Sequence, residues 1–304
     1  MTLSLSTMWA QQERFVADMH EFVHEALAMG YDAIEISHAT PEAPFERLLS
    51  YHDVPISSIH APAPLVRHEG QRANSALNLA ALDPDERATA VDYTKRCIER
   101  TARAGGKFVV VHLGGVGNEM FPAERELRRL YDSGTRDGDH VEELRATCHE
   151  QRREQSGAWF EQARATLVEL ARCAEDNEVA LGIENRLHYH EIPQPDEGAA
   201  LFADYAPEMV GYWHDVGHAE VQWRLGLVDK HRWLDTNGAR CLGTHLHDVT
   251  GLADHRAPGN GDVDWTYIRD GLPSGALRVF EINQGQPPED VARAIPFLRE
   301  RGVI

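Results

Sequence analysis

The chain of 304 residues contains eight short apolar runs separated by segments with helical periodicity, and this alternation limits the folds open to it. The runs end in polar residues and are followed by stretches in which apolar residues recur at intervals of three and four, as Phe160, Ala163, Leu167 and Leu170 do. Such alternation is typical of βα units and a parallel sheet. The predicted strands cover residues 3–6, 32–37, 56–60, 107–113, 179–185, 209–215, 241–247 and 277–283.

Eight strands alternating with helices predict an α/β chain folded as a (β/α)8 TIM barrel, with a single domain over residues 1–304. The alternative is a doubly wound open sheet, which normally carries a glycine-rich phosphate-binding turn after an early strand. The stretch HLGGVGNEMF at residues 112–121 lacks the G-x-G-x-x-G spacing, so we favour the barrel.

Residues 119–157, which follow the fourth predicted strand, are highly charged and too long for an ordinary connection. We expect an insertion on the C-terminal face of the barrel. It would act as a lid or as a subunit contact in a homo-oligomer. A solvated helical hairpin is an equally good interpretation of the same charge pattern.

The formal net charge of −19 repels phosphate backbones, so we do not expect the chain to bind nucleic acid. Its four cysteines are widely spaced and include no C-x-x-C pair, which indicates reduced thiols. Residues 1–15 lack the basic and apolar pattern of a signal peptide, and no apolar stretch is long enough to span a membrane. We therefore expect a cytoplasmic protein with no membrane partner.

Six of the predicted strands place a side chain that can bind a metal ion at or near their C-terminal ends. In a barrel these strand ends meet at one mouth, where residues far apart in the sequence become neighbours. Glu184 follows the apolar Leu181 and Ile183 and would be costly to bury alone, and a shared divalent cation explains its position. The candidate metal ligands are His60, His112, Glu184, Asp215, His245, His247 and Glu281.

Strand periodicity narrows these candidates. His245 and His247 share one face of their strand, so either could reach the ion. His214 and Asp215 face opposite ways, and we assign Asp215 to the site and His218 to the loop just beyond it. Mixed Glu, Asp and His ligands suit a divalent metal such as Mn, Zn, Co or Mg.

Histidines elsewhere in the chain carry less information. His188 and His190 follow Glu184 in a loop at the mouth, where they could contact substrate, although a mobile surface loop is the simpler interpretation. Those on predicted helices and other loops, His38 among them, receive no role.

Several motifs, taken in order, resemble the xylose-isomerase-like TIM barrels, from about residue 3 to residue 300. This superfamily includes sugar and sugar-phosphate isomerases and epimerases, dehydratases of cyclic polyols and keto acids, and the endonuclease IV DNA-repair enzymes. Each motif alone is weakly specific, but the combination of all of them is specific. The motifs are YDAIEIS, IHAP, VVVHLG, LGIEN, HDVGH, HLHD, PGNGDVDW and VFEIN.

The resemblance implies a site in which one divalent cation is held by a Glu, an Asp, a His and a second Glu. The matching residues are Glu184, Asp215, His245 and Glu281. The family pattern around the seventh strand favours His245, with His247 as the alternative. His218, in DVGH, matches a histidine that contacts substrate, and Arg256 or His255 matches a position that grips substrate oxygens.

The endonuclease IV branch adds histidines on the third and fourth strands, and His60 and His112 match them. The resemblance therefore allows a second metal ion held by these two residues. The last ion of that branch needs an Asp-x-His pair. If His255 takes the histidine place, Ala253 takes the aspartate place and Asp254 is one residue out of register, so we expect an incomplete third site.

The leading hypothesis is a metal-dependent isomerase or epimerase of a small sugar, sugar phosphate or related polyhydroxy carbonyl compound, working through a metal-stabilised enediolate. Glu184 and Glu281 would exchange the proton, and His218, Arg256, His255 and His188 would contact the substrate. The alternatives are a metal-dependent dehydratase of a cyclic polyol or keto acid, an endonuclease IV-like phosphodiesterase with a zinc cluster, and a barrel that only binds a sugar or metal.

Overall fold

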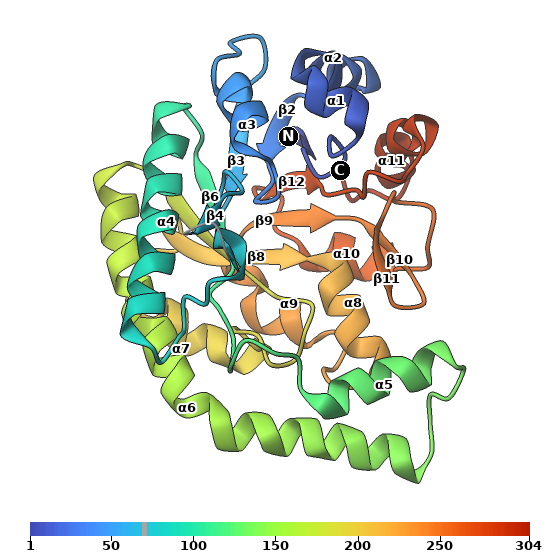
Figure 1. Cartoon of the computed structure of the whole chain (residues 1–304). Coiled ribbons are helices and arrows are strands. Elements are labelled where there is room, and N and C mark those ends of the chain that lie inside the picture. Colours follow the sequence, from blue (N-terminus) through green and yellow to red (C-terminus); the bar gives the residue numbers. More distant parts are fainter. Residues whose placement is uncertain (69–71) are drawn as a thin grey trace.

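The computed structural model, which describes residues 1–68 and 72–304, contains a closed barrel of parallel strands (Figure 1). Around the ring the order is β1, β12, β9, β8, β7, β6, β3 and β2, so that neighbours in the chain are neighbours in the barrel. The bounds are β1 Leu3–Ser6, β2 Ala33–Ile36, β3 Ile56–His60, β6 Phe108–Val111, β7 Ala180–Glu184, β8 Val210–Asp215, β9 Cys241–Leu246 and β12 Leu277–Phe280. Each strand lies within its predicted range, and the predicted (β/α)8 barrel is confirmed.

Helices surround the barrel. They are α1 Glu13–Ala17, α2 Met19–Met29, α3 Glu42–Leu49, α4 Pro84–Arg103, α5 Pro122–Asp132, α6 Asp139–Asp176, α7 Gly198–Phe202, α8 Val216–Arg224, α9 Arg232–Asn237, α10 Trp265–Gly271 and α11 Pro288–Glu300. Three short 3-10 turns cover Asn74–Ala76, Pro195–Glu197 and Gly238–Arg240. In the described part of the chain, no helix is both long and apolar enough to cross a membrane.

A tryptophan fills the barrel interior beneath the mouth. Trp213 of β8 is fully buried and packs with Val110 and Val279. Its ring fits over two strand glycines: a Cβ added to Gly182 would lie 2.5 Å from the indole, and one added to Gly243 would lie 2.3 Å from it. Because side chains alternate along a strand, Asp215, two residues further on, also points inward but one layer higher, at the mouth.

Two short antiparallel strand pairs among the described residues interrupt the βα pattern. The pair β4 Arg67–His68 and β5 Arg72–Ala73 follows the third barrel strand, and the pair β10 Asp248–Thr250 and β11 Ala253–Arg256 follows β9. In the second hairpin the pairing is irregular near Asp248, and His255 has a left-handed backbone with φ of 53°. This bulged conformation re-aims the side chains that follow the turn.

Residues 119–157 form α5 and the first half of α6, a helix of 38 residues that runs along one side of the molecule (Figure 1). They contact the loop that follows β7. Glu124 of α5 accepts a hydrogen bond from the backbone N–H of Tyr189 (2.9 Å), and Arg152 of α6 donates one to the Tyr189 carbonyl (2.8 Å). The insertion thus fixes a segment that begins at the C-terminal end of a barrel strand.

Candidate metal centre

Four ligand-type side chains from consecutive barrel strands converge at the mouth. They are Glu184 at the end of β7, Asp215 at the end of β8, His245 in β9 and Glu281 directly after β12. One ligand atom from each lies within 4.8 Å of those from the others, and all four side chains are buried. Parallel strand register produces this convergence, since Asp215 pairs directly with His245 across β8 and β9.

His245 stands at the middle of this group. Its Nδ1 atom lies 2.8 Å from Glu184 Oε1, 3.1 Å from Glu281 Oε2 and 3.5 Å from Asp215 Oδ2. Its Nε2 atom lies 3.0 Å from Oε1 of Glu35, a fully buried carboxyl of β2. Burial alone would lower the pKa of His245, but the carboxylates of Glu281 and Glu35 outweigh it and raise that pKa well above its usual value.

The donor set fits a divalent cation. Burial would raise the pKa values of Glu184, Asp215 and Glu281, yet the surrounding cationic and imidazole groups hold all three below their usual range, as ligands require. Glu281 Oε1 is buried without a hydrogen-bond partner in the described part of the chain. Carboxylate and imidazole ligands in one buried group suit Mn²⁺, Zn²⁺, Co²⁺ or Mg²⁺.

His247 lies beside this group but is oriented by protein atoms on both sides. The backbone N–H of His255 donates to its Nδ1 atom (2.9 Å), so the proton of the neutral ring is on Nε2. That Nε2 atom lies 3.0 Å from both oxygens of Asp215, to which it donates. His247 also belongs to a candidate ligand group, with Asp215, His255 and Glu281. We propose His245, whose Nδ1 atom faces Glu184, Asp215 and Glu281, as the ligand, and His247 remains the alternative.

His218 turns back into the mouth from the start of α8. Its backbone N–H donates to Asp215 Oδ1 (2.7 Å), and its Nδ1 atom donates to the carbonyl of Asn185 (3.1 Å). Its Nε2 atom is then unprotonated and lies 3.9 Å from Asp254 Oδ2.

Contrary to the expectation from residue spacing, Asp254 joins His218 and His255 in a separate group of ligand-type side chains. His255 Nδ1 lies 3.1 Å from Asp254 Oδ1, and its Nε2 atom lies 3.4 Å from Glu281 Oε2. The left-handed backbone of His255 explains the difference, because it rotates two adjacent residues of β11 towards the same side. The aspartate of this group is therefore Asp254, and Ala253 has no part in it.

His60 and His112 approach Glu184 from the opposite side. The Nε2 atom of His112 lies 2.7 Å from Glu184 Oε2, and that of His60 lies 3.5 Å from the same oxygen. His38, just after β2, completes a cluster of three imidazoles with them. Burial and the charge of His60 lower the pKa of His38 to about 3, so its ring is neutral near pH 7.

The structure places the other predicted contacts with substrate around the same mouth. His188 lies 3.1 Å from Glu124 Oε1 and so faces α5, while its ring stacks near His190. Arg256 lies in β11 beside His255, with its Nε atom buried and without a hydrogen-bond partner among the described residues.

Glu35 and Arg186 were not among the residues predicted for this region, His38 was given no role, and Asp254 was placed one residue out of register. Glu35 had a detectable signal, since it interrupts an apolar strand as Glu184 does. Arg186, two residues after Glu184, lies 2.8 Å from Glu184 Oε2. Only the folded loop brings it there.

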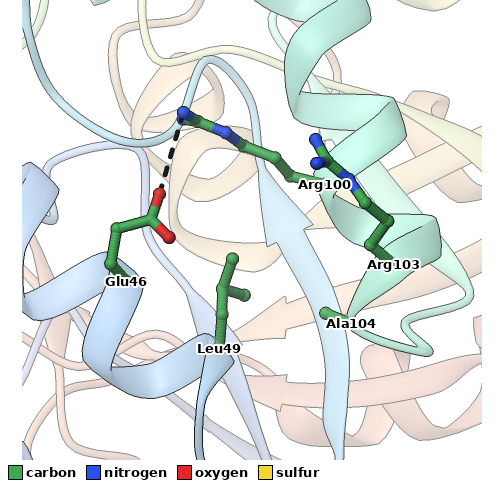
Figure 2. Close-up of a pocket in the computed structure, with 5 residues that line it drawn as sticks. All are labelled: Glu46, Leu49, Arg100, Arg103 and Ala104. Atoms are coloured by element: carbon green, nitrogen blue, oxygen red, sulfur yellow. Dashed lines mark ion pairs between the residues drawn. The ribbon is translucent and has the colours of Figure 1, made fainter.

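A separate pocket lies between α3 and α4, lined by Glu46, Leu49, Arg100, Arg103 and Ala104 (Figure 2). Arg100 and Glu46 form an ion pair across it (3.7 Å). Its lining includes the last turns of both helices, which return the chain to the N-terminal ends of the strands, away from the mouth. None of the candidate ligands lines it.

Comparisons with known proteins agree with this architecture. A family model described as xylose isomerase-like TIM barrel matches residues 23–301. Similar solved structures include a D-tagatose 3-epimerase-like protein, with 18% identity, a TM-score of 0.69 and coverage of 99% of this chain and 97% of the other. An L-ribulose 3-epimerase has 14% identity, a TM-score of 0.67 and coverage of 100% and 95%.

The D-psicose 3-epimerase of Clostridium cellulolyticum H10 has 15% identity, a TM-score of 0.66 and coverage of 100% of both chains. No curated protein matches the sequence. At these identities the likeness concerns the fold, while the family model covers most of the chain. The chain therefore belongs to the xylose isomerase-like TIM barrel family.

Proposed function

We propose that the protein is a divalent-metal-dependent isomerase or epimerase of a small sugar, sugar phosphate or related polyhydroxy carbonyl compound. The convergence of Glu184, Asp215, His245 and Glu281 at the barrel mouth carries this proposal. When bound there, a divalent ion polarises a carbonyl or hydroxyl oxygen and so favours deprotonation of the adjacent carbon.

The two glutamates suit the exchange of that proton. Glu184 ends β7 and Glu281 follows β12. Because β8 and β9 lie between these two strands in the ring, the two glutamates approach the centre of the group from different sides. Both pKa values lie below the usual range because neighbouring cationic and imidazole groups outweigh burial, so both groups are unprotonated, as a group that is to accept a proton must be. The unpartnered Oε1 atom of Glu281 is free to do so within the described structure.

Substrate oxygens would be held by the groups around this pair. The Nε2 atom of His218 is an acceptor directed into the mouth. Burial lowers the pKa of His255, but the carboxylates of Asp254 and Glu281 outweigh it and raise that pKa, which makes His255 a cationic donor. Solved neighbours named as a D-tagatose 3-epimerase-like protein, an L-ribulose 3-epimerase and a D-psicose 3-epimerase support ketoses as the first substrates to test.

Glu184→Gln tests the proposal. The variant should stay folded and lose about 100- to 10,000-fold in turnover of a ketose, because the amide cannot act as a base. Turnover is measured by chromatographic separation of the sugar epimers with added Mn²⁺, and folding by circular dichroism. Glu169→Gln, at an exposed position on α6, is the control. Retained turnover in Glu184→Gln would contradict the assignment of this base.

The group formed by His218, Asp254 and His255 favours one second candidate, hydrolysis of a phosphodiester by a zinc cluster. Zinc bound in all the ligand groups, together with nicking of duplex DNA at abasic positions, would support it and overturn the epimerase. The net charge of −19 opposes binding to a DNA backbone.

A further inference from the structure

Three ligand atoms on the β3, β6 and β7 side of the mouth are spaced as if to share one small ion. The Nε2 atoms of His60 and His112 lie 2.9 Å apart, and Glu184 Oε2 lies 2.7 Å from the second and 3.5 Å from the first. Ligands of a tetrahedral zinc ion, at bond lengths of about 2.0–2.2 Å, are separated by roughly 3.3 Å. The observed separations of 2.9, 2.7 and 3.5 Å are close to this value, so these three atoms form a candidate position for a second ion.

A positive charge of the chain already lies at this position. Arg186 Nη1 is 2.8 Å from Glu184 Oε2 and 2.6 Å from His112 Nε2. Because a guanidinium only donates hydrogen bonds, His112 Nε2 accepts this one and uses the lone pair that would bind a metal.

The loop that carries Arg186 is fixed rather than free to withdraw. The Nε atom of Arg186 donates a hydrogen bond to the Glu191 carboxylate (3.2 Å). The backbone carbonyl of Arg186 accepts one from the side-chain amide of Gln222 (2.7 Å). Glu191 is held in turn by the backbone N–H of His188 (2.8 Å). The contacts of Glu124 and Arg152 with Tyr189 brace the same loop from the insertion.

We propose that Arg186 is a fixed second cation of the centre, which takes the place of a metal ion between His60, His112 and Glu184. Glu184 then has two separate roles: Oε1 faces the four-residue group, and Oε2 binds the guanidinium. A metal ion at the second position would need to displace a hydrogen-bonded charge of the same sign. This inference rests on the proposed metal dependence of the four-residue group.

The test compares zinc stoichiometry and zinc positions, independently of activity. Purified wild-type protein and Arg186→Met are saturated with Zn²⁺, desalted and analysed by mass spectrometry, and anomalous scattering from crystals locates the ions. The wild type should show no ion between His60 and His112, while Arg186→Met should gain about one ion per chain there. The double variant Arg186→Met/His112→Ala should lose that gain.

Two controls separate charge from packing. Arg186→Lys keeps the positive charge and should match the wild type. Arg224→Met removes a similarly buried arginine, paired with Glu220 and Asp262 outside the centre, and should also leave the count unchanged. If Arg186→Met fails to fold, Arg186→Gln replaces it, and the anomalous map of the wild type remains decisive by itself.

Zinc between His60 and His112 in the wild type, or no gain in a folded Arg186 variant, would overturn the inference and leave the proposed function intact. A wild-type protein that binds no zinc, manganese, cobalt or magnesium would overturn both.

Discussion

Both ring nitrogens of His247 are engaged by protein groups, although the side chain lies within reach of the same mouth as His245. The sequence places the two histidines on one strand face and does not separate them. One of the two contacts of His247 comes from the β10–β11 hairpin, whose backbone brings the N–H of His255 to one ring nitrogen. Hydrogen bonds of this kind orient metal ligands and set their charge distribution.

Replacement of His247 by Ala should weaken metal binding by about 10- to 100-fold, because Asp215 loses the donor that orients it. Titration calorimetry with Mn²⁺ on metal-free protein measures this change. His140→Ala, at an exposed position on α6, should bind the ion as the wild type does. A loss as complete as that of His245→Ala would instead identify His247 as a ligand.

The residues that sequence reasoning found and those it missed differ in how they reach the mouth. Glu184 and Asp215 end barrel strands, so the β-strand period and the closure of a barrel are sufficient to place them. Arg186 and Asp254 depend on the path of a loop and on a left-handed backbone at His255, and neither has a periodic signal. His38 was set aside as a loop residue, and only the pairing of β2 with β3 brings it beside His60.

The insertion formed by α5 and the first half of α6 acts on the loop after β7 through Glu124. This carboxylate is fully buried and contacts Arg128, His188 and the backbone of Tyr189. Charge and length in the sequence predicted an insertion at residues 119–157, but the contacts that tie it to the mouth lie too far apart in sequence to be predicted. We propose that it positions the loop of Arg186.

Glu124→Gln should reduce the free energy of unfolding by about 1–3 kcal/mol near neutral pH. Burial raises the pKa of Glu124, but the hydrogen bond from His188 and the charge of Arg128 outweigh it, so the folded pKa lies below 4.5. The stabilisation is therefore present above pH 4.5 and is lost as the pH falls through the folded pKa. Urea unfolding at several pH values measures this.

Glu126 of the same helix, which is about one-third exposed and pairs with Arg129, supplies the control. Arg129 also lowers the pKa of Glu126, but solvent screens this surface pair, so Glu126→Gln should show a smaller pH-dependent gap than Glu124→Gln. A gap between wild type and Glu124→Gln that persists unchanged at low pH would mean that the amide disturbs packing rather than charge.

The barrel interior shows how shape, beyond apolar pattern, sets this fold. Trp213 occupies the space left by Gly182 and Gly243 on the two adjacent strands. The alternation of strands and helices was sufficient to predict the barrel, since its signal is repeated eight times along the chain. The fit of one indole over two glycines has no such repeated signal.

Gly243→Ala should destabilise the protein by about 1–3 kcal/mol, because the added Cβ would lie 2.3 Å from the indole of Trp213. Thermal unfolding measures the change. Gly275→Ala adds the same methyl group where no atom lies within 4 Å, and should be close to neutral. Equal melting temperatures for the two variants would contradict this packing argument.

The four converging ligands come from β7, β8, β9 and β12, which form one continuous arc of the ring. An ion bound there would stabilise the folded state by about 2.7 kcal/mol at 100 times its dissociation constant. Hydrogen exchange with and without Mn²⁺ should therefore slow most in this arc and least in β2 and β3. Uniform slowing around the ring would contradict a site confined to these strands.

The arc also has two borders, where β7 meets β6 and where β12 meets β1. Across these seams, strands linked by the ion would adjoin β6 and β1, which contribute no member of the four-residue group. Removal of the ion should let the arc loosen as a unit, so the seams are where a metal-free barrel would first open to a protease.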